Sequence, residues 1–389
     1  MSYELASSSW GAEEIQAIQR VVASGRFTMG ENVQRFEELF ARKFGMQHAL
    51  MVSSGSTANL VGIAALFYKN DRPLRRGDEV IVPSISWATT YYPLQQYGLK
   101  LKFLDVEIDT LNMDVSKLEE ALTPRTRMVV AVSILGNPCA LDVIRKFCDQ
   151  HGLYLFEDNC ESMGAELGGK PCGTFGDIGT FSTFFSHHIS TMEGGVLVTN
   201  NTEIYHLARS IRAHGWTRDI PADSPIYEKR DDDFFEAYRF ILPGYNARPL
   251  ELCGAIGVEQ LKKLDDMIAT RRRNAKVFTE LFKGDERFII QRENGKSSWF
   301  AFTVILNPKF NVDRKRVMNA MKQADIGYRI ITGGNFLRHD VIKHFDYECV
   351  GEIKNADIAH DRGFFVGNHP HDVTPQIRRF HEVLVEAAG

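Results

Sequence analysis

Blocks of hydrophobic residues with two different periods follow one another along this chain. Apolar residues recur at helical spacing in residues 13–23 and again in 31–44, which predicts two amphipathic helices. The next apolar run, "HALMVSSGSTANLVGIAALF" at residues 48–67, predicts a strand, a turn and a helix. Ser56 or Thr57 is placed to cap that helix. The residues expected on its apolar face are Leu60, Ile63, Ala64 and Phe67.

Short apolar runs of strand length recur after this helix, with helical or loop stretches between them. These runs are residues 78–83, 101–106, 127–133, 153–158, 178–184 and 194–200. Their spacing favours a mainly parallel sheet with helices on both faces. We therefore expect a large α/β domain over residues 1–250.

The pattern changes in the last third of the chain. Residues 218–234 are polar and predict a long excursion, and residues 244–282 predict a long helix that leaves the large domain. Apolar runs at 297–306 and 326–332 predict strands beyond it. A smaller α+β domain over residues 251–389 is the expected result.

Composition excludes several classes of function. The chain has 389 residues with 46 basic and 50 acidic side chains, and no basic run suggests binding to nucleic acid or to a membrane surface. The N-terminus lacks the pattern of a signal peptide, and no stretch has the length of a spanning helix, so we expect a cytoplasmic protein. The six cysteines form no CxxC pair, so neither a zinc site nor an iron–sulfur cluster is expected.

Two motifs contain groups that suit a bound ligand, and each has a purely structural alternative. Gly55, Ser56 and Thr57 stand at a strand-to-helix turn, where free backbone N–H groups and the helix dipole suit a phosphate, although such a turn can also be a simple cap. Trp87 follows a predicted strand end, where it can stack on a ligand or belong to the core.

Carboxylates follow the apolar run 153–158, at the sheet edge where open α/β folds bind ligands. The alternative for these acidic residues is that they are solvated loop charges. They are Glu157, Asp158 and Glu161.

These motifs together resemble the aspartate aminotransferase superfamily, in particular its sugar aminotransferase and dehydratase branch, which uses pyridoxal phosphate. The resemblance implies an aspartate aminotransferase-like α/β fold. It also implies that Asp158 pairs with the ring nitrogen, Glu161 lies near the ring hydroxyl and Trp87 stacks on the ring. The phosphate ligands that it implies are Gly55, Ser56, Thr57, Ser182 and Asn246, the last from a neighbouring subunit of a homodimer. Weaker candidates for contacts with the substrate are His188, His214, Arg218 and Arg329.

The place of the Schiff-base lysine holds histidine in this chain. In aminotransferases of this branch the lysine lies six residues before the glutamate of an "EGG" turn. Here that turn begins at Glu193, so the count reaches His187, with His188 as its neighbour. A shift of one residue would exchange the two. Adjacent side chains diverge in an extended loop, so no metal site is expected.

Histidine redirects the chemistry, because imidazole moves protons but forms no Schiff base with the cofactor. Pyridoxal phosphate or pyridoxamine phosphate must then be held noncovalently, with L-glutamate as amino donor. An imidazole with a pKa near neutrality can remove a proton and then protonate a leaving hydroxyl. The chain resembles 3-dehydratases for GDP-linked 4-keto-6-deoxy sugars, and the cysteines do not match the relatives that need an iron–sulfur reductase. GDP follows from this resemblance alone.

Two other hypotheses remain open at this point. One is a nucleotide-sugar 4-aminotransferase, for which the expected lysine is absent. The other is a noncatalytic relative that binds a ligand or regulates a partner, for which loss of the lysine is the expected mark. The phosphate turn, Asp158, Glu161 and Asn246 favour the enzyme.

Overall fold

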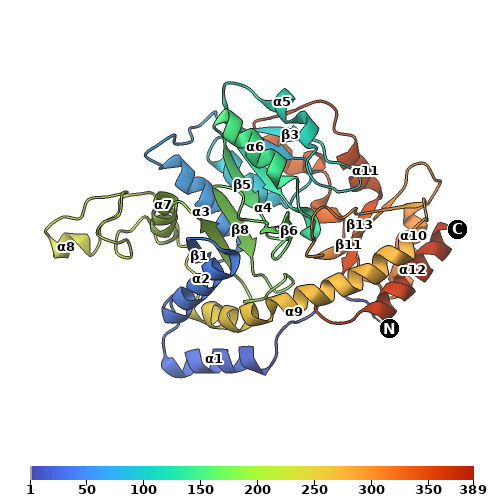
Figure 1. Ribbon diagram of the computed structural model, residues 1–389, viewed down its shortest axis with the longest axis horizontal. Helices are drawn as coiled ribbons and strands as arrows, with labels where there is room; N and C mark the ends of the chain where they lie inside the picture. The colour runs from blue at the N-terminus through green and yellow to red at the C-terminus, as the bar shows by residue number, and fades with distance from the viewer. Residues whose placement is uncertain (1) are drawn as a thin grey trace.

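The computed structural model describes residues 2–389 and has a central sheet of eight strands. The sheet has the strand order β1-β9-β8-β5-β4-β2-β3-β12 (Figure 1). Its strands are β1 (His48–Val52), β2 (Glu79–Pro83), β3 (Lys100–Leu104), β4 (Thr126–Val132), β5 (Tyr154–Asp158), β8 (Ile178–Ser182), β9 (Gly195–Thr199) and β12 (Tyr347–Cys349). Strand β9 runs antiparallel to both β1 and β8, and the other pairs are parallel. The predicted mainly parallel sheet is confirmed.

Helices cover both faces of this sheet. Successive residues of a strand point to opposite faces, so Phe156 packs in the cluster with α3, α4 and α7, whereas Leu155 packs against α6. At the β1 end of that second face, α2 and α9 pack over Phe181 of β8. The helices that precede the excursion are α1 (Ala12–Ser24), α2 (Glu31–Phe44), α3 (Gly55–Phe67), α4 (Ala88–Gln96), α5 (Leu118–Ala121), α6 (Leu141–His151) and α7 (Thr202–Arg212), with the 3-10 helices η1 (Val115–Lys117) and η2 (Ile134–Gly136).

A second, antiparallel sheet of three strands lies in the C-terminal part of the chain and packs against one end of α9. Tyr3 from the N-terminus belongs to the same core and donates a hydrogen bond to the Gly367 carbonyl. The elements of this part are α9 (Glu251–Phe282), β10 (Phe288–Ile290), β11 (Ala301–Leu306), α10 (Arg314–Gln323), η3 (Ile331–Gly333), η4 (Phe336–Arg338), η5 (Asp340–His344), α11 (Asn355–Arg362), β13 (Gly363–Gly367) and α12 (Thr374–Ala388).

The boundary at residue 250 stays a prediction, and two segments cross it. Strand β12 pairs with β3 at the edge of the large sheet, and Phe336 and Ala356 belong to the core of that sheet. In the other direction, Tyr3 packs in the C-terminal core. Each part of the chain therefore contributes residues to the hydrophobic core of the other part.

Helix α3 differs from the prediction in its cap and in its burial. The N-cap is Ser54, whose Oγ accepts from the Thr57 N–H, so neither Ser56 nor Thr57 is the cap. The helix is apolar on nearly all sides, and Leu60, which was expected on the apolar face, is less buried than Val61, which was not. A helix enclosed on all sides needs no polar face.

The predicted strand at residues 326–332 is wrong. Only isolated bridges form there, from Ile326 to Tyr3 and from Arg329 to Phe365, and left-handed backbone at Asp325 and Thr332 brackets the segment. Helix α9 begins at Glu251 and not at 244, because Ala247 pairs with the backbone of Ser53 and Arg212 before Pro249.

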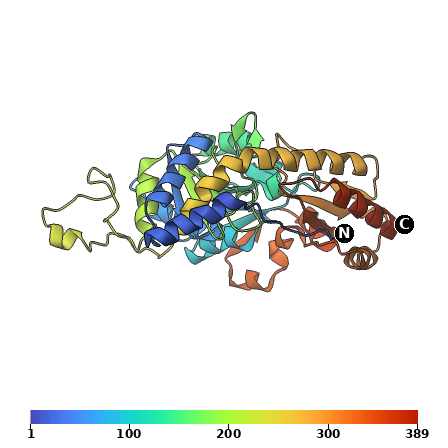
Figure 2. The same ribbon diagram turned by 90° about the horizontal axis from the view of Figure 1, so that it is seen from below.

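The predicted excursion stands clear of the body in both views (Figures 1 and 2) and carries the short helix α8 (Asp233–Glu236). A two-stranded hairpin of β6 (Glu166–Leu167) and β7 (Lys170–Pro171) lies elsewhere. Between residues 2 and 389 no helix has the length and apolar content needed to cross a membrane. Over the same range no three His, Cys, Asp or Glu side chains are grouped as a metal site.

Candidate active site

The N-terminus of α3 meets the ends of β5 and β8 at very close range. A Cβ added at Gly55 would lie 2.7 Å from the Cβ of Ser182 and 2.8 Å from the Sγ of Cys160. Only glycine permits this approach. The structure therefore brings together the predicted phosphate turn, Ser182 and the loop that follows Asp158.

Replacing Gly55 with alanine should destabilise the protein by about 1–3 kcal/mol, because the new methyl group meets two neighbours below contact distance. Urea unfolding measures the change. Ser56→Ala is the matched control, since it removes only the hydrogen bond between Ser56 Oγ and Thr89 Oγ1 (2.8 Å) and adds no volume. Equal stability of Gly55→Ala and wild type would contradict the close packing.

Asp158 is buried and held by three donors. Its Oδ2 accepts from Asn59 Nδ2 (2.8 Å) and from Thr90 Oγ1 (2.7 Å), and its Oδ1 accepts from the Cys160 N–H (3.1 Å). Thr180 Oγ1 donates to Asn59 Oδ1 (2.6 Å) and so fixes the amide with its N–H groups toward Asp158. The cluster therefore holds the carboxyl group in one orientation.

Trp87 lies at the start of α4, three residues before Thr90, and is 60% exposed. The alternative that it is a core tryptophan is wrong. A large exposed indole at the N-cap of α4, the helix that also supplies a donor to Asp158, is available to stack on a flat ligand.

Glu161 joins this cluster to the C-terminal part of the chain. Its Oε2 accepts from the Leu135 N–H (2.9 Å) and from Thr332 Oγ1 (3.4 Å). Burial, with the negative charge of Asp158 as a smaller cause, raises the pKa of Glu161 to about 7. The carboxyl is thus half protonated near neutral pH.

Glu157 has a structural position. It is fully buried, and its oxygens accept from the N–H groups of Gly173 (2.7 Å) and Gly176 (2.5 Å). Burial raises the pKa of Glu157 to about 7. The alternative that these acidic residues are solvated loop charges is wrong for all three.

The two histidines point to different surroundings. The His188 side chain is 1% exposed, and its Nε2 lies 3.3 Å from the Ser298 carbonyl oxygen. The His187 ring is half-buried and packs edge-on against Phe184 and Phe300, with ring centroids 5.9 Å and 5.1 Å away. Phe300 also donates its N–H to the carbonyl of Leu135, the residue whose N–H bonds to Glu161. His187 and Glu161 are therefore linked through Phe300 and Leu135.

The protonation of His187 differs from the expectation. Burial and the positive charge of Arg271 lower the pKa of His187 to about 4, so the imidazole is neutral at neutral pH. Its Nδ1 is buried without a hydrogen-bond partner among the described residues. The neutral ring has a nitrogen that can accept a proton but is a weaker base than an ordinary imidazole, and its protonated form is a stronger acid than an ordinary imidazolium.

The remaining candidates lie at the surface. The His214 N–H donates to the Tyr245 carbonyl beside Asn246, and both His214 and Asn246 are exposed. Arg218 is stacked on Trp216, 5.1 Å from the ring centroid, and Arg329 bonds to the Tyr328 carbonyl. Within residues 2–389 no recorded contact joins Arg218 or Arg329 to the cluster around Asp158.

Sequence reasoning missed four residues of this site. Asn59 is the polar exception in an otherwise apolar helix, which was a usable signal. Thr90, Arg271 and Phe300 carried no local signal, because their roles depend on contacts between distant elements.

The residues present fit a pyridoxal phosphate group. The first turn of α3, which begins at Gly55, offers backbone N–H groups to an anion, and Asp158 offers a fixed carboxylate for a ring nitrogen. The exposed Trp87 offers a flat apolar surface.

Comparisons with known proteins agree with this geometry. A family model described as "DegT/DnrJ/EryC1/StrS aminotransferase family" matches residues 8–384. The GDP-4-keto-6-deoxy-D-mannose 3-dehydratase of Yersinia pseudotuberculosis is 50% identical over 386 residues, which cover 99% of this chain and 98% of that protein.

Solved structures are similar over almost the whole chain. A GDP-4-keto-6-deoxymannose-3-dehydratase with a trapped PLP-glutamate geminal diamine has a TM-score of 0.97 and 50% identity, and the match covers 98% of this chain and 100% of that one. A variant of ColD, with a serine and the histidine that follows it replaced by asparagine and lysine, has a TM-score of 0.95 and 50% identity, covering 97% and 100%. The predicted aminotransferase-like fold is confirmed.

Proposed function

Because the chain belongs to the DegT/DnrJ/EryC1/StrS aminotransferase family, we propose that it is a dehydratase of this family. It removes the C3 hydroxyl of GDP-4-keto-6-deoxy-D-mannose and gives GDP-4-keto-3,6-dideoxy-D-mannose. Pyridoxal phosphate and pyridoxamine phosphate are its noncovalently bound cofactor forms, and L-glutamate is the amino donor. The products of a turnover also include 2-oxoglutarate and ammonia.

The observation that carries this proposal is a histidine in the place of the Schiff-base lysine, beside an intact cofactor cluster. Asp158 keeps its three donors, and Gly55 keeps its close approach to Ser182. A noncatalytic scaffold needs neither feature, and a 4-aminotransferase of this family needs the lysine.

His187 is the proposed acid and base of the pair. It is the less buried histidine, whereas the His188 ring bonds to a backbone carbonyl. The ColD variant adds support, since the histidine replaced there directly follows a serine. In this chain His187 follows Ser186, and His188 follows another histidine.

Each residue then has a defined task. The bound cofactor supplies an electron sink, and Asp158 keeps its ring nitrogen protonated. Nε2 of the neutral His187 accepts a proton from carbon, and the resulting imidazolium donates it to the C3 hydroxyl, which leaves as water. The low pKa of His187 favours this second transfer. Trp87 stacks on the ring, and Ser56, Thr57, Ser182 and Asn246 bind the phosphate.

A homodimer is the proposed assembly. The excursion exposes apolar aromatic rings, among them Phe234 at 81% exposure, and a second copy of the chain would cover such a surface. Asn246 is exposed, and its Oδ1 accepts from Arg248 Nε (3.0 Å), which leaves its amide N–H groups to donate to a neighbouring phosphate. Light scattering should give twice the 44.1 kDa of one chain. His214, Arg218 and Arg329 remain proposed contacts for the sugar nucleotide, whereas His188 is 1% exposed and bonded to the Ser298 carbonyl, which does not fit that role.

The test is a reaction with GDP-4-keto-6-deoxymannose, glutamate and pyridoxal phosphate, followed by mass analysis of the sugar nucleotide. Loss of one water with release of ammonia supports the dehydratase. An amino sugar product would identify a 4-aminotransferase. No change in the sugar, with no 2-oxoglutarate formed, would indicate a noncatalytic protein.

Glu161→Gln should remove a pH dependence of cofactor binding. The pKa of Glu161 is raised to about 7, so its carboxyl is protonated and able to donate below pH 7 and ionised above it. Pyridoxamine phosphate should therefore bind wild type about threefold to tenfold more weakly at pH 8.5 than at pH 6. The glutamine donates at both pH values, so the variant should show a smaller change. Fluorescence titration measures both proteins, and parallel pH profiles would contradict the role of Glu161.

A further inference from the structure

The loop that carries His187 is closed at its base. The Thr191 N–H donates to the Thr183 carbonyl (2.8 Å), and the two hydroxyls lie 2.5 Å apart. Inside the loop the His187 N–H donates to the Phe184 carbonyl (2.9 Å). This bond involves only the backbone, and the His187 side chain itself contacts the rings of Phe184 and Phe300. The place of the imidazole therefore depends on the path of the loop.

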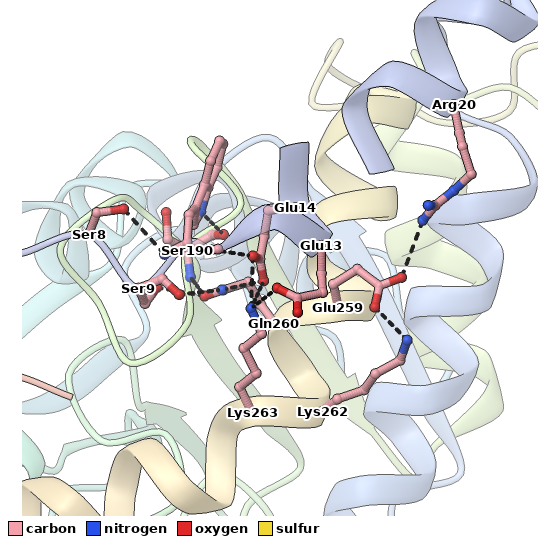
Figure 3. A network of polar contacts seen from close by, with 12 residues as sticks. Ser8, Ser9, Glu13, Glu14, Arg20, Ser190, Glu259, Gln260, Lys262 and Lys263 are labelled. Atoms are coloured by element: carbon pink, nitrogen blue, oxygen red, sulfur yellow. Dashed lines mark hydrogen bonds and ion pairs between the residues drawn. The ribbon is translucent and has the colours of Figure 1, made fainter. Parts of the chain in front are cut away.

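Ser190 in this loop is held from two distant parts of the chain. Its N–H donates to Gln260 Oε1 in α9 (3.0 Å), and its carbonyl accepts from Trp10 Nε1 in the segment before α1 (3.0 Å). Figure 3 shows Ser190 and Gln260 side by side in one polar network with Ser9 and Glu14. Both backbone groups of Ser190 are thus bound.

Gln260 cannot turn its amide around. It is fully buried, and its Nε2 donates to Glu14 Oε1 (2.8 Å), which only accepts when ionised. Its Oε1 must then face the Ser190 N–H and Ser9 Oγ (2.7 Å). Glu14 is itself buried and paired with Lys263 (2.8 Å). The network sets one orientation of the amide and one position for Ser190.

We propose that Trp10 and Gln260 are positioning residues that clamp Ser190 and so hold His187 in place for proton transfer. A lysine in this place would be fixed by its covalent bond to the cofactor, whereas an imidazole has no such tether. A misplacement of about 1 Å can cost on the order of 100-fold in rate. The catalytic part of this inference rests on the proposed function, but the clamp itself can be tested without it.

The first measurement is hydrogen exchange of the loop amides in the full-length protein, followed by mass spectrometry. Gln260→Met and Trp10→Phe should each raise exchange in residues 183–191 by about tenfold or more, because each removes a hydrogen bond to Ser190. Arg20→Met is the matched control. It breaks the ion pair of Arg20 in α1 with Glu259 in α9 (3.3 Å). This pair joins the two helices that carry Glu14 and Gln260, and it does not touch the loop. Unchanged exchange in both clamp variants would overturn the proposal.

The second measurement is the rate of dehydration. Gln260→Met should lower kcat about tenfold to 100-fold with KM and cofactor affinity nearly unchanged, whereas Arg20→Met should keep the wild-type kcat. In the His187→Asn background, Gln260→Met should have little further effect, because the imidazole that it positions is gone. If Gln260→Met lowers kcat by the same factor in the wild-type and the His187→Asn protein, its effect is a general structural one, and this result would contradict positioning. Absence of dehydration in wild type would reject the proposed function, and the exchange result would still decide the clamp.

Discussion

His187→Asn should lower the rate of dehydration by at least about 10³-fold, because it removes the group proposed for both proton transfers. Asparagine keeps the polar character and much of the volume of the side chain, and the cluster around Asp158 is untouched. Binding of pyridoxamine phosphate should therefore stay within about threefold of wild type. Water loss measured by mass spectrometry, together with equilibrium dialysis of the cofactor, checks both parts.

His188→Asn is the matched control for this prediction. Its ring nitrogen contacts the Ser298 carbonyl, so the substitution should lower stability more than it lowers kcat. If His188→Asn loses dehydration and His187→Asn keeps it, the assignment of the base moves to His188. In a third variant, His187→Lys, the new lysine should form a Schiff base with the cofactor, which borohydride reduces and so traps on the protein. An unchanged absorption spectrum would contradict the place assigned to His187.

Asp158→Asn should lower dehydration by on the order of 100-fold to 1,000-fold, because the negative charge that keeps the ring nitrogen protonated is lost. The amide cannot satisfy all three donors that now surround the carboxylate. The absorption spectrum of bound pyridoxal phosphate should shift, and this spectrum reports the change apart from turnover.

Thr90→Val provides a graded control for Asp158→Asn. It removes one of the two side-chain donors to Asp158 Oδ2 and leaves the charge in place. We expect a loss of about tenfold, smaller than that of Asp158→Asn, because the charge and the donor Asn59 remain. If the two variants lose the same activity, the charge of Asp158 is not what matters and its role must be revised.

Much of the site could be predicted from the sequence, because its parts are local in the chain. The turn at Gly55 needs only a strand, a small residue and a helix in succession. Asp158 follows an apolar strand directly, and His187 lies at a countable distance from Glu193. The spacing of the apolar runs likewise predicted the mainly parallel sheet, since inner strands such as β2, β5 and β8 are continuous buried runs.

Only the tertiary structure decided which groups surround these residues. The side-chain donors to Asp158 come from α3 and α4, the His188 ring contacts the Ser298 carbonyl, and the clamp on Ser190 joins Trp10 to Gln260. The failed strand at 326–332 has the same origin, because its partners were decided by how the C-terminal segment packs. Such contacts join residues far apart in the chain, and side-chain order along the sequence carries no record of which elements meet. The sequence by itself determined the chemistry available, and the packing of distant elements determined the protonation of His187 and what holds it in place.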